Sequence, residues 1–466
     1  MIRAAVGLEL RNLLRSPLRL IVLALVLGAG CFVVVQGQED VDRWQEAIET
    51  GQTEAEESLA EVRGYFAAGE PGPADRSWVD LTQPRWQDYY AATRLARTPA
   101  PLAGIAFASA EAGAVTMRLT RSSDPLLATG NKIENPALAA AGGLDLVTVL
   151  TLLIPLLVLA LGLEIGGYER AAGVLPLVRV QSGRDRAWIW ARCLAVGLIA
   201  AAAGLVLTLL AAFVAGAGLG DVLPLALLVL AYVAAWTALL GAVALVAHNP
   251  SHGAVALGAA WIVLCVLIPA IAVERAAALA ADDFALDLTV EARDAGAALA
   301  ALDDEALYAG LWARFPALQE QTPERRETGR RAAREGMRIV GLEQRMAQRE
   351  QRAQAQADLV AGTSLASPAV AFTHAVERLA GRGPEATRAF RHAIAAAAAE
   401  RMQLYIAASW SGATLDAEDF ERLVAATPDS VAPPPSAWWR ELLILVTWTL
   451  GLVGLATFLS RRTPGG

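Results

Sequence analysis

The sequence predicts an all-α membrane protein with six transmembrane helices and two exported, mostly helical segments. Hydrophobic residues make up 55% of the 466-residue chain, and charged residues only 18%. The apolar residues gather in runs of 18 or more, and about 20 helical residues are enough to cross the ~30 Å hydrocarbon core of a bilayer. Two long polar segments separate these runs, so the chain is expected to leave and re-enter the membrane repeatedly.

The predicted elements follow in order from the N-terminus. Within residues 1–17, Ile2, Val6, Leu10 and Leu13 can share one helical face, which predicts a short helix in the membrane interface. The six spans are predicted at 18–35, 144–163, 188–219, 222–247, 253–273 and 440–460. The other predicted parts are a first exported segment at 36–143, a loop at 164–187 and a second exported, helical domain at 274–437.

Prolines and composition refine these ranges. Pro155 predicts a kink in the second span, which membrane helices tolerate when neighbours satisfy the freed carbonyl. Pro-Gly-Pro at 71–73 and Pro-Ala-Pro at 99–101 predict breaks in the first exported segment, and residues 115–119 are a candidate strand. The stretch 291–360 is rich in Ala, Glu, Gln, Arg and Leu, which predicts long helices.

A cleaved signal peptide is an alternative interpretation of the first span. The span follows basic residues, and Gly28-Ala29-Gly30-Cys31 weakly resembles a lipoprotein cleavage site. A large aliphatic residue is expected where Gly28 stands, so an uncleaved anchor is the prediction. Cys31, Cys193 and Cys265 all lie in or beside apolar runs, which predicts small apolar packing residues and no disulfide framework in the polar segments.

Arginine placement predicts the orientation. Six spans put both termini and the short loops 164–192 and 248–252 on one side of the membrane. The arginines of that side are Arg3, Arg11, Arg15, Arg19, Arg170, Arg179, Arg184, Arg186, Arg192, Arg461 and Arg462, and its acids are Glu9, Glu164, Glu169 and Asp185. The positive-inside rule makes this side cytoplasmic. The protein is therefore expected in the plasma (inner) membrane, with both termini in the cytoplasm.

The chain lacks the sequence features of an ATPase. A Walker A loop needs a Gly-Lys-Ser/Thr step, because its lysine reaches the β and γ phosphates. Lys132 is the only lysine, and Ile133 follows it. The sequence therefore contains no P-loop, and any ATP hydrolysis that drives the protein must occur in another chain.

The sequence also gives little support for ion-coupled transport, metal binding or catalysis. The interiors of the third, fourth and fifth spans contain no ionisable side chain of the kind that ion-coupled carriers place at mid-membrane. His248 and His252 have metal-binding spacing, but Pro250 interrupts a helix there, and a polar turn is the prediction. No catalytic constellation and no metal site are predicted.

The loop between the second and third spans is the most informative stretch. It runs from Tyr168 to Arg184, with apolar residues bounded by glycines and flanked by charges. This pattern suits docking into a groove on a soluble partner. An ordinary interfacial connector explains the same pattern, and the residues alone do not decide between the two.

At this loop the chain resembles ABC-2 type permeases, the membrane subunits of ABC transporters. Glu169, Arg170, Gly173 and Leu175 match the Glu-Arg…Gly-x-Leu pattern of their coupling helix, which docks on the ATPase. Gln181-Ser182 falls where the family often has Ser-Gln-Pro, although the proline is missing here. The resemblance implies ATP and Mg²⁺ on a separate ATPase subunit and no cofactor in this chain.

A subgroup of that family, with a large exported domain of unknown function, shares further features. It is often labelled as permeases for multi-copper enzyme maturation. The residues that resemble its hallmarks are Glu134, Asn135, Pro136, Asp145, Ser367, Pro368, Leu379, Ala380, Gly381 and His392. The four histidines and five methionines do not cluster, so the sequence itself gives the copper label no support.

Two functions remain open at this stage. The leading hypothesis is a permease subunit of an ABC-2 type system that pairs with a second copy or a sister permease. The rival is a non-transporting membrane scaffold or mechanotransmitter that uses the same ATPase to act on an envelope partner. Membrane lipid is an expected partner in both cases, and nucleic acid is not. An enzyme with an exported active site has no residue-level support.

Overall fold

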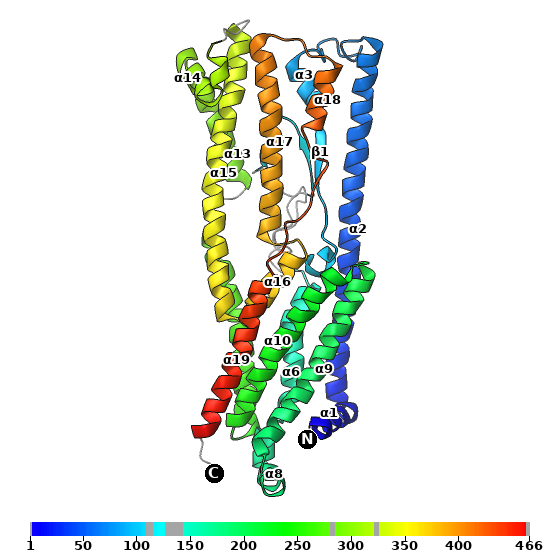
Figure 1. Ribbon diagram of the computed structural model, residues 1–466, viewed down its shortest axis with the longest axis vertical. Coiled ribbons are helices and arrows are strands. Elements are labelled where there is room, and N and C mark those ends of the chain that lie inside the picture. The colour runs from blue at the N-terminus through cyan, green and yellow to red at the C-terminus, as the bar shows by residue number, and fades with distance from the viewer. Residues whose placement is uncertain (1, 109–114, 126–142, 280–284, 321–325, 463–466) are drawn as a thin grey trace.

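A computed structural model describes residues 2–108, 115–125, 143–279, 285–320 and 326–462. Its lower half is a bundle of membrane-type helices, and its upper half is an extramembrane domain (Figure 1). The first part of the chain forms α1 (Ile2–Arg15), α2 (Pro17–Ala68), α3 (Pro84–Tyr90), β1 (Thr93–Arg97), η1 (Ala103–Ala106) and β2 (Thr116–Leu119). The residues that the family resemblance placed at 134–136 lie outside the described ranges.

The remaining elements complete the membrane bundle and build most of the upper domain. The middle of the chain forms α5 (Leu146–Thr148), η3 (Val149–Leu153), α6 (Ile154–Gly162), α7 (Gly167–Ala171), α8 (Val174–Ser182), α9 (Asp185–Val214), α10 (Leu219–Val246), α11 (Pro250–Trp261), η4 (Ile262–Leu267) and α12 (Ile268–Leu279). The last part forms α13 (Ala285–Ala301), α14 (Asp304–Arg314), η5 (Pro316–Leu318), α15 (Arg326–Ala366), α16 (Pro368–Leu379), α17 (Pro384–Ser411), α18 (Ala417–Ala425), β3 (Ser430–Val431) and α19 (Trp439–Arg462).

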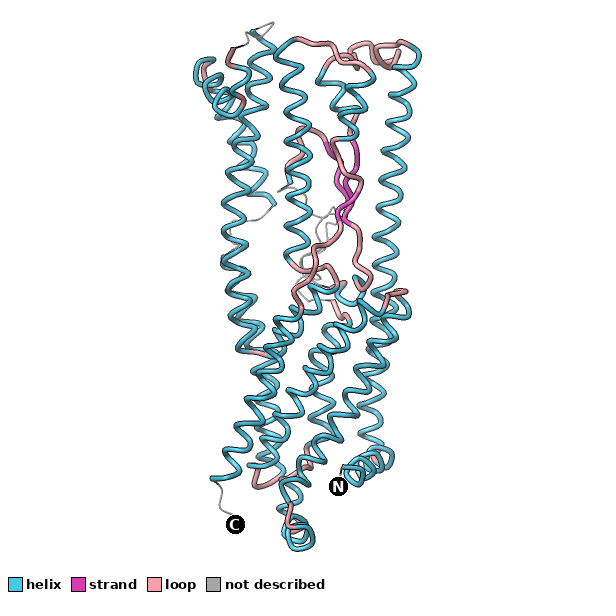
Figure 2. Tube along the Cα trace, in the orientation of Figure 1, coloured by secondary structure: helices cyan, strands magenta, loops and turns pink. Residues whose placement is uncertain are grey.

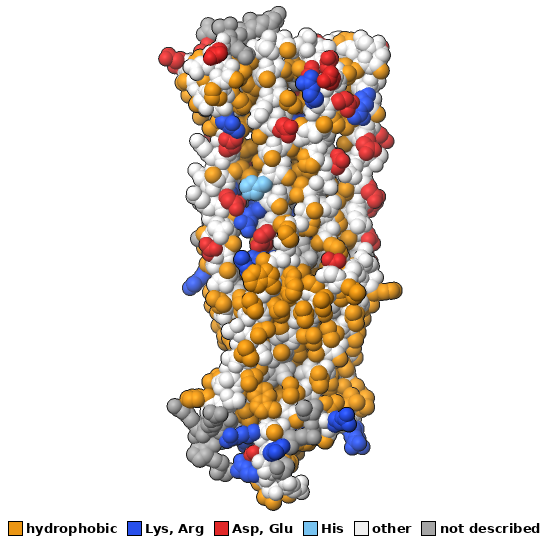
Figure 3. Space-filling model, viewed as in Figure 1, with side chains coloured by type: hydrophobic (Ala, Val, Ile, Leu, Met, Phe, Trp, Pro, Cys, Tyr) orange, Lys and Arg blue, Asp and Glu red, His pale blue; other side chains and the backbone are white. Residues whose placement is uncertain are grey.

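The prediction of an all-α membrane protein with six spans is confirmed. The described residues contain six helical segments that are long and apolar enough to cross a membrane: Pro17–Ala68, Leu146–Ala171, Asp185–Val214, Leu219–Val246, Pro250–Ala276 and Trp439–Leu459. On the face drawn in Figure 3, an apolar belt covers the lower half, acidic side chains gather above it, and arginines mark its lower rim. We call this lower rim the arginine-rich end.

The helix that contains the first predicted span continues past residue 35, where the apolar run ends. α2 is one helix of 52 residues that starts in the membrane and continues to the far tip of the extramembrane domain (Figure 1). Ser16 caps its start, and Gly69 ends it with a φ of 70°. At 1.5 Å per residue its length is about 78 Å. A single rigid element therefore joins the membrane bundle to the tip.

Two π-helical turns interrupt the membrane helices. The kink predicted at Pro155 corresponds to η3, which lies directly before it, and η4 interrupts the fifth span. Wide turns of this kind free backbone carbonyls, which must find other donors in a membrane. The hydroxyl of Tyr232 donates to Thr151 O at 2.7 Å, Trp261 Nε1 donates to Leu152 O at 3.1 Å, and Ser367 Oγ donates to Leu264 O at 2.6 Å. Side chains of α10 and α11 and of the residue that caps α16 thus bind these turns.

The extramembrane domain has a small sheet beside its long helices. The candidate strand at 115–119 is confirmed as β2, which pairs antiparallel with β1, while β3 pairs parallel with β1 on the other side. Figure 2 shows the strands in the upper half of the molecule. Arg401 of α17 is fully buried, and its guanidinium donates to Asp88 Oδ1 at 3.2 Å and to Leu423 O at 2.9 Å. This arginine joins α17 to α3 and α18.

α16 connects the domain to the membrane bundle. Its Phe372 stacks on Tyr232 of α10 with ring centroids 4.5 Å apart, and both side chains are buried. Arg378 Nη1 contacts Glu441 of α19 at 2.7 Å. Arg382, which follows α16, contacts Asp40 of α2 at 2.5 Å. Motion of α16 must therefore be shared with three spans.

A pH-dependent loss of stability is expected at this junction. Burial, followed by the charge of Arg378, lowers the pKa of the His374 imidazole from 6.5 to about 4, although Glu385 opposes the shift. Glu441 lies 4.0 Å from His374 Nδ1, but Arg378 already occupies that carboxylate at 2.7 Å. Between pH 6.5 and 4 the unfolded chain binds a proton that folded His374 does not, so stability falls as the pH is lowered.

We expect this histidine alone to lower the free energy of unfolding by about 2 kcal/mol between pH 7 and pH 5. Chemical unfolding of the purified chain at both pH values measures the loss. His374→Gln should show a correspondingly smaller loss, whereas His392→Gln, whose side chain is 60% exposed, should behave as the wild type. Equal acid sensitivity of His374→Gln and the wild type would contradict this assignment.

Candidate docking site at the arginine-rich end

The predicted coupling loop forms two short helices, α7 and α8, at the lower end of the molecule (Figure 1). Gly173 separates them with a φ of 72°, and Gly183 ends α8 with a φ of 63°. L-residues with side chains rarely adopt these angles. Gly173 is one of the residues that match the coupling-helix pattern, and its backbone angle gives a structural reason for the glycine. No atom lies within 4 Å of a Cβ built on Gly173, so the turn itself requires the glycine.

Glu169 faces inward. Glu169 is 4% exposed. Its Oε1 accepts hydrogen bonds from Arg192 Nη1 at 2.5 Å and from Trp188 Nε1 at 3.0 Å. Its Oε2 accepts from the Gly166 amide at 3.2 Å. All these partners belong to the same chain. Glu169 therefore fixes α7 against the start of α9 and presents no free carboxylate to a partner protein.

A buried ion cluster extends from Glu169 to the N-terminal helices. Arg192 Nε contacts Glu9 of α1 at 2.5 Å, and Arg19 Nη1 contacts the other Glu9 oxygen at 3.5 Å. Arg19 Nη2 contacts Glu164 at 2.7 Å. Two guanidinium groups thus meet three carboxylates. Glu164 is 60% exposed and lies at the edge of this network. We refer to the four buried members, Glu9, Arg19, Glu169 and Arg192, as the buried ion cluster, and it joins α1, α2, α7 and α9.

Arg170 binds the end of α10. Its guanidinium donates to the backbone carbonyls of Ala244 at 3.1 Å, Leu245 at 2.6 Å and Ala247. The last carbonyls of a helix have no partner within the helix, so an arginine here satisfies groups that would otherwise be orphaned. Glu169 and Arg170, which are adjacent in sequence, therefore attach α7 to α9 and to α10.

α8 has apolar residues on two faces. Leu175, which matches the last position of the Glu-Arg…Gly-x-Leu pattern, is 6% exposed and packs in the core, so its side chain offers little surface to a partner. Val174, Leu177 and Val180 are instead 39%, 57% and 85% exposed. We call these three residues the outer face of α8. Their spacing of three places them on one side of the helix.

The sequence alone could not identify the outer face of α8. Its three-residue period is visible there, but Leu175 and Val178 repeat with the same period one residue out of phase, and only the fold shows which set is inside.

Gln181 is exposed, and Ser182 is the last residue of α8. An exposed apolar stripe on a short helix at a polar end of a membrane protein indicates contact with a partner or with the membrane interface.

The family-motif residues outside this loop mostly begin and end helices. Asp145 caps α5 by accepting from the Thr148 amide at 2.8 Å. Ser367 caps α16, and Pro368 is its first residue. Leu379, Ala380 and Gly381 form its end, where Gly381 has a φ of 63°. His392 lies on α17 with its Nε2 3.5 Å from Glu350. The predicted Glu134, Asn135 and Pro136 lie outside the described residues.

Comparison with known proteins adds one domain match. Residues 284–425 match a family model described as a domain of unknown function, DUF3526. This match covers α13 to α18, and together with the apolar helices it fits a membrane protein. No curated protein and no solved structure matches the chain. In the part of the chain that the structure describes, no three His, Cys, Asp or Glu side chains are grouped so that they could hold a metal.

Proposed function

We propose that this chain is the permease subunit of an ABC-2 type transporter, driven by a separate ATPase subunit that binds ATP and Mg²⁺. The observation that carries the proposal is the outer face of α8, an apolar surface at the arginine-rich end. Positive-inside orientation places that end, and both chain termini, in the cytoplasm of a cell whose plasma membrane holds the protein. A soluble ATPase could reach α8 there.

The contacts of α7 explain how a push on α8 would reach the spans. α8 is joined through Gly173 to α7, whose Glu169 binds Arg192 of α9 and whose Arg170 binds the last carbonyls of α10. These polar contacts are largely buried, so breaking them is costly, and the helices move together at lower cost. Closure of the ATPase would therefore displace α9 and α10, and through Glu9 also α1.

The transport pathway in this proposal lies between two permease chains. Tyr232, Trp236 and Phe372 fill the bundle core, and each is at most 1% exposed. A pathway through this packed region would require large rearrangement. A second copy or a sister permease facing this chain would supply the other wall.

Mechanotransmission without transport is the second candidate function. It is favoured by α2, which runs unbroken from the membrane to the tip of the domain, and by the contact between Arg382 and Asp40 that binds α2 to the α16–α17 junction. In this version the ATPase would move the extramembrane domain against an envelope partner. A fluorophore at Ser58 on α2 that responds to ATP without any substrate flux would favour it.

The proposal is tested by purifying the native complex from membranes. We expect an ATPase chain to co-purify with this protein and the complex to hydrolyse ATP, whereas the isolated chain should not, because it has no P-loop. ATP turnover that persists in the isolated chain after removal of contaminating ATPases would contradict the proposal that a separate subunit hydrolyses ATP. A native preparation free of any ATPase would remove the basis of the proposal.

The orientation makes a separate prediction. A cysteine placed at Ser58 or at Gln354 should react with an impermeant thiol reagent added to whole cells, whereas one at Arg184 should not. All three positions are exposed in the structure, and two of the native cysteines, Cys193 and Cys265, are buried. Labelling at Arg184 alone would reverse the assigned topology.

A further inference from the structure

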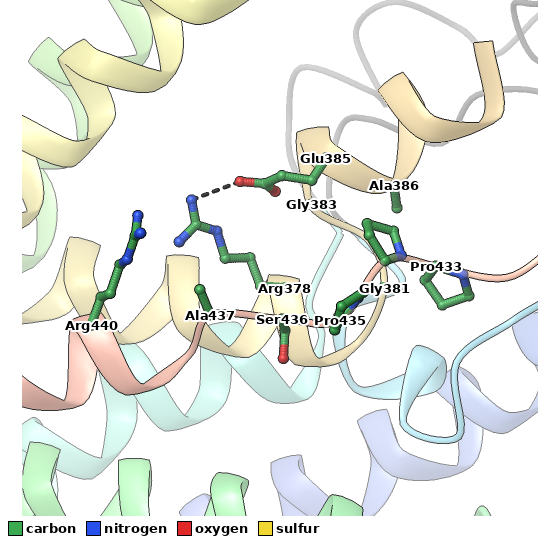
Figure 4. Close-up of a pocket in the computed structure, with 11 residues that line it drawn as sticks. Arg378, Gly381, Gly383, Glu385, Ala386, Pro433, Pro435, Ser436, Ala437 and Arg440 are labelled. Atoms are coloured by element: carbon green, nitrogen blue, oxygen red, sulfur yellow. Dashed lines mark hydrogen bonds and ion pairs between the residues drawn. The ribbon is translucent and has the colours of Figure 1, made fainter. Parts of the chain in front are cut away.

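Two adjoining cavities lie where the extramembrane domain meets the membrane bundle. The first, of about 220 Å³, is lined by the end of α16, the start of α17 and the segment that leads into α19 (Figure 4). The second, of about 210 Å³, extends to Asp221 and Pro224 at the start of α10. Both are lined by Arg378, Gly381, Pro433, Pro434 and Ser436. Trp438, on the second cavity, and Trp439 are typical of a membrane–water interface.

The charges on the cavity walls are incompletely paired. Arg378 contacts both Glu385 at 2.6 Å and Glu441 at 2.7 Å, so one guanidinium serves two carboxylates. Arg378 Nε and Glu385 Oε2 are buried without a hydrogen-bond partner. Arg440 is exposed and lies over the Trp439 ring at 5.5 Å. Figure 4 shows its guanidinium on the same side of the chain as that of Arg378.

Asp221 completes this pattern on the second cavity. Among the described residues, neither Asp221 nor Arg440 makes an ion pair. A cation on one wall and an anion on the other therefore face the same pair of cavities. A ligand that carries both charges would satisfy both, whereas a simple anion would leave the carboxylate of Asp221 unpaired.

We propose that these cavities bind the headgroup of phosphatidylethanolamine from the leaflet on the domain side. The phosphodiester would lie against Arg440 and Arg378, because guanidinium groups pair well with phosphate oxygens. The primary ammonium would donate to Asp221. Phosphatidylglycerol lacks this ammonium, and the quaternary ammonium of phosphatidylcholine has no N–H to donate. The position at the start of two spans, α10 and α19, places the headgroup at lipid level.

The test uses the full chain reconstituted in vesicles of equimolar phosphatidylethanolamine, phosphatidylcholine and phosphatidylglycerol. After detergent extraction and washing, native mass spectrometry counts the lipids that remain bound. We expect phosphatidylethanolamine to be retained at least about tenfold over the other two, corresponding to about 1.4 kcal/mol. Arg440→Ala should abolish this retention. Asp221→Asn should keep phospholipid binding but lose the preference for the primary amine.

Arg85→Ala is the matched control, because Arg85 is also exposed and lies 4.8 Å over a neighbouring tryptophan ring, but on α3, away from the cavities. It should retain lipid as the wild type does. The same headgroup could come from a membrane lipid or from a soluble compound, and soluble glycerophosphoethanolamine distinguishes the two. If it binds as tightly as the lipid does, the site belongs to a soluble phosphodiester. Equal retention of the three lipids by the wild type, or unchanged retention in both cavity variants, would overturn the proposal.

Discussion

Arg192→Ala is expected to destabilise the protein by about 3–5 kcal/mol, because it leaves Glu169 buried without a counter-charge and leaves Glu9 with only the longer contact to Arg19. The Arg192 side chain is 7% exposed and contacts Glu9 and Glu169 at 2.5 Å each. Its loss would remove the ion pairs that join α9 to both α1 and α7. Chemical unfolding of the purified chain measures the change, and the yield of folded protein from membranes should fall with it.

Arg186→Ala is the control, because Arg186 lies on the same helix but is exposed. It should change the free energy of unfolding by less than about 0.5 kcal/mol. Arg192→Leu combined with Glu9→Gln and Glu169→Gln should recover part of the loss, since the uncompensated charges are then gone. An Arg192→Ala protein as stable as the control would show that the buried ion cluster does not hold these helices.

Because of the same cluster, Glu169→Arg would not be a clean test of docking on an ATPase. An arginine at this position would face Arg192 in a buried site, and like charges there destabilise the fold directly. Lost assembly with an ATPase would then report unfolding and not a broken docking contact. A variant that tests docking has to lie on the outer face of α8.

The membrane spans were predictable from sequence because lipid imposes a strong rule. About twenty apolar residues must follow one another wherever a helix crosses the bilayer, and this run is visible without any knowledge of packing. The end of a helix has no such marker. α2 continues past residue 35 because Gln36 and its polar successors are compatible with a solvated helix, so the run ends where the membrane ends and the helix does not.

The candidate site was predictable only in location. Its glycines and the Glu-Arg pair drew attention to the loop that forms α7 and α8, but the direction in which each side chain points depends on neighbours distant in sequence. Glu9 lies 183 positions from Arg192, and the carbonyls that bind Arg170 belong to α10. The small sheet was equally incomplete, because only two residues of β3 pair with β1 and so short a strand has no sequence period.

If the proposed function holds, Leu177→Asp and Val180→Asp together should abolish assembly with the proposed ATPase subunit while the chain itself remains folded. The two side chains are 57% and 85% exposed, so a carboxylate at either position stays in water and leaves the core intact. In a docked complex the two introduced carboxylates would be buried away from water without a counter-charge. Substituting one buried apolar anchor of an interface costs about 2 kcal/mol or more of binding free energy. The affinity of the double variant should therefore fall more than about a hundredfold.

Stoichiometry and ATP turnover of the co-purified complex measure this effect, and unfolding of the isolated variant verifies its fold. Trp78→Asp is the matched control: it also replaces an exposed apolar side chain, 65% accessible, but in the extramembrane domain. It should assemble normally. If the double α8 variant also assembles and hydrolyses ATP as the wild type does, the outer face of α8 contacts only the membrane interface. The helix is then a connector, and the permease proposal loses the observation that carries it.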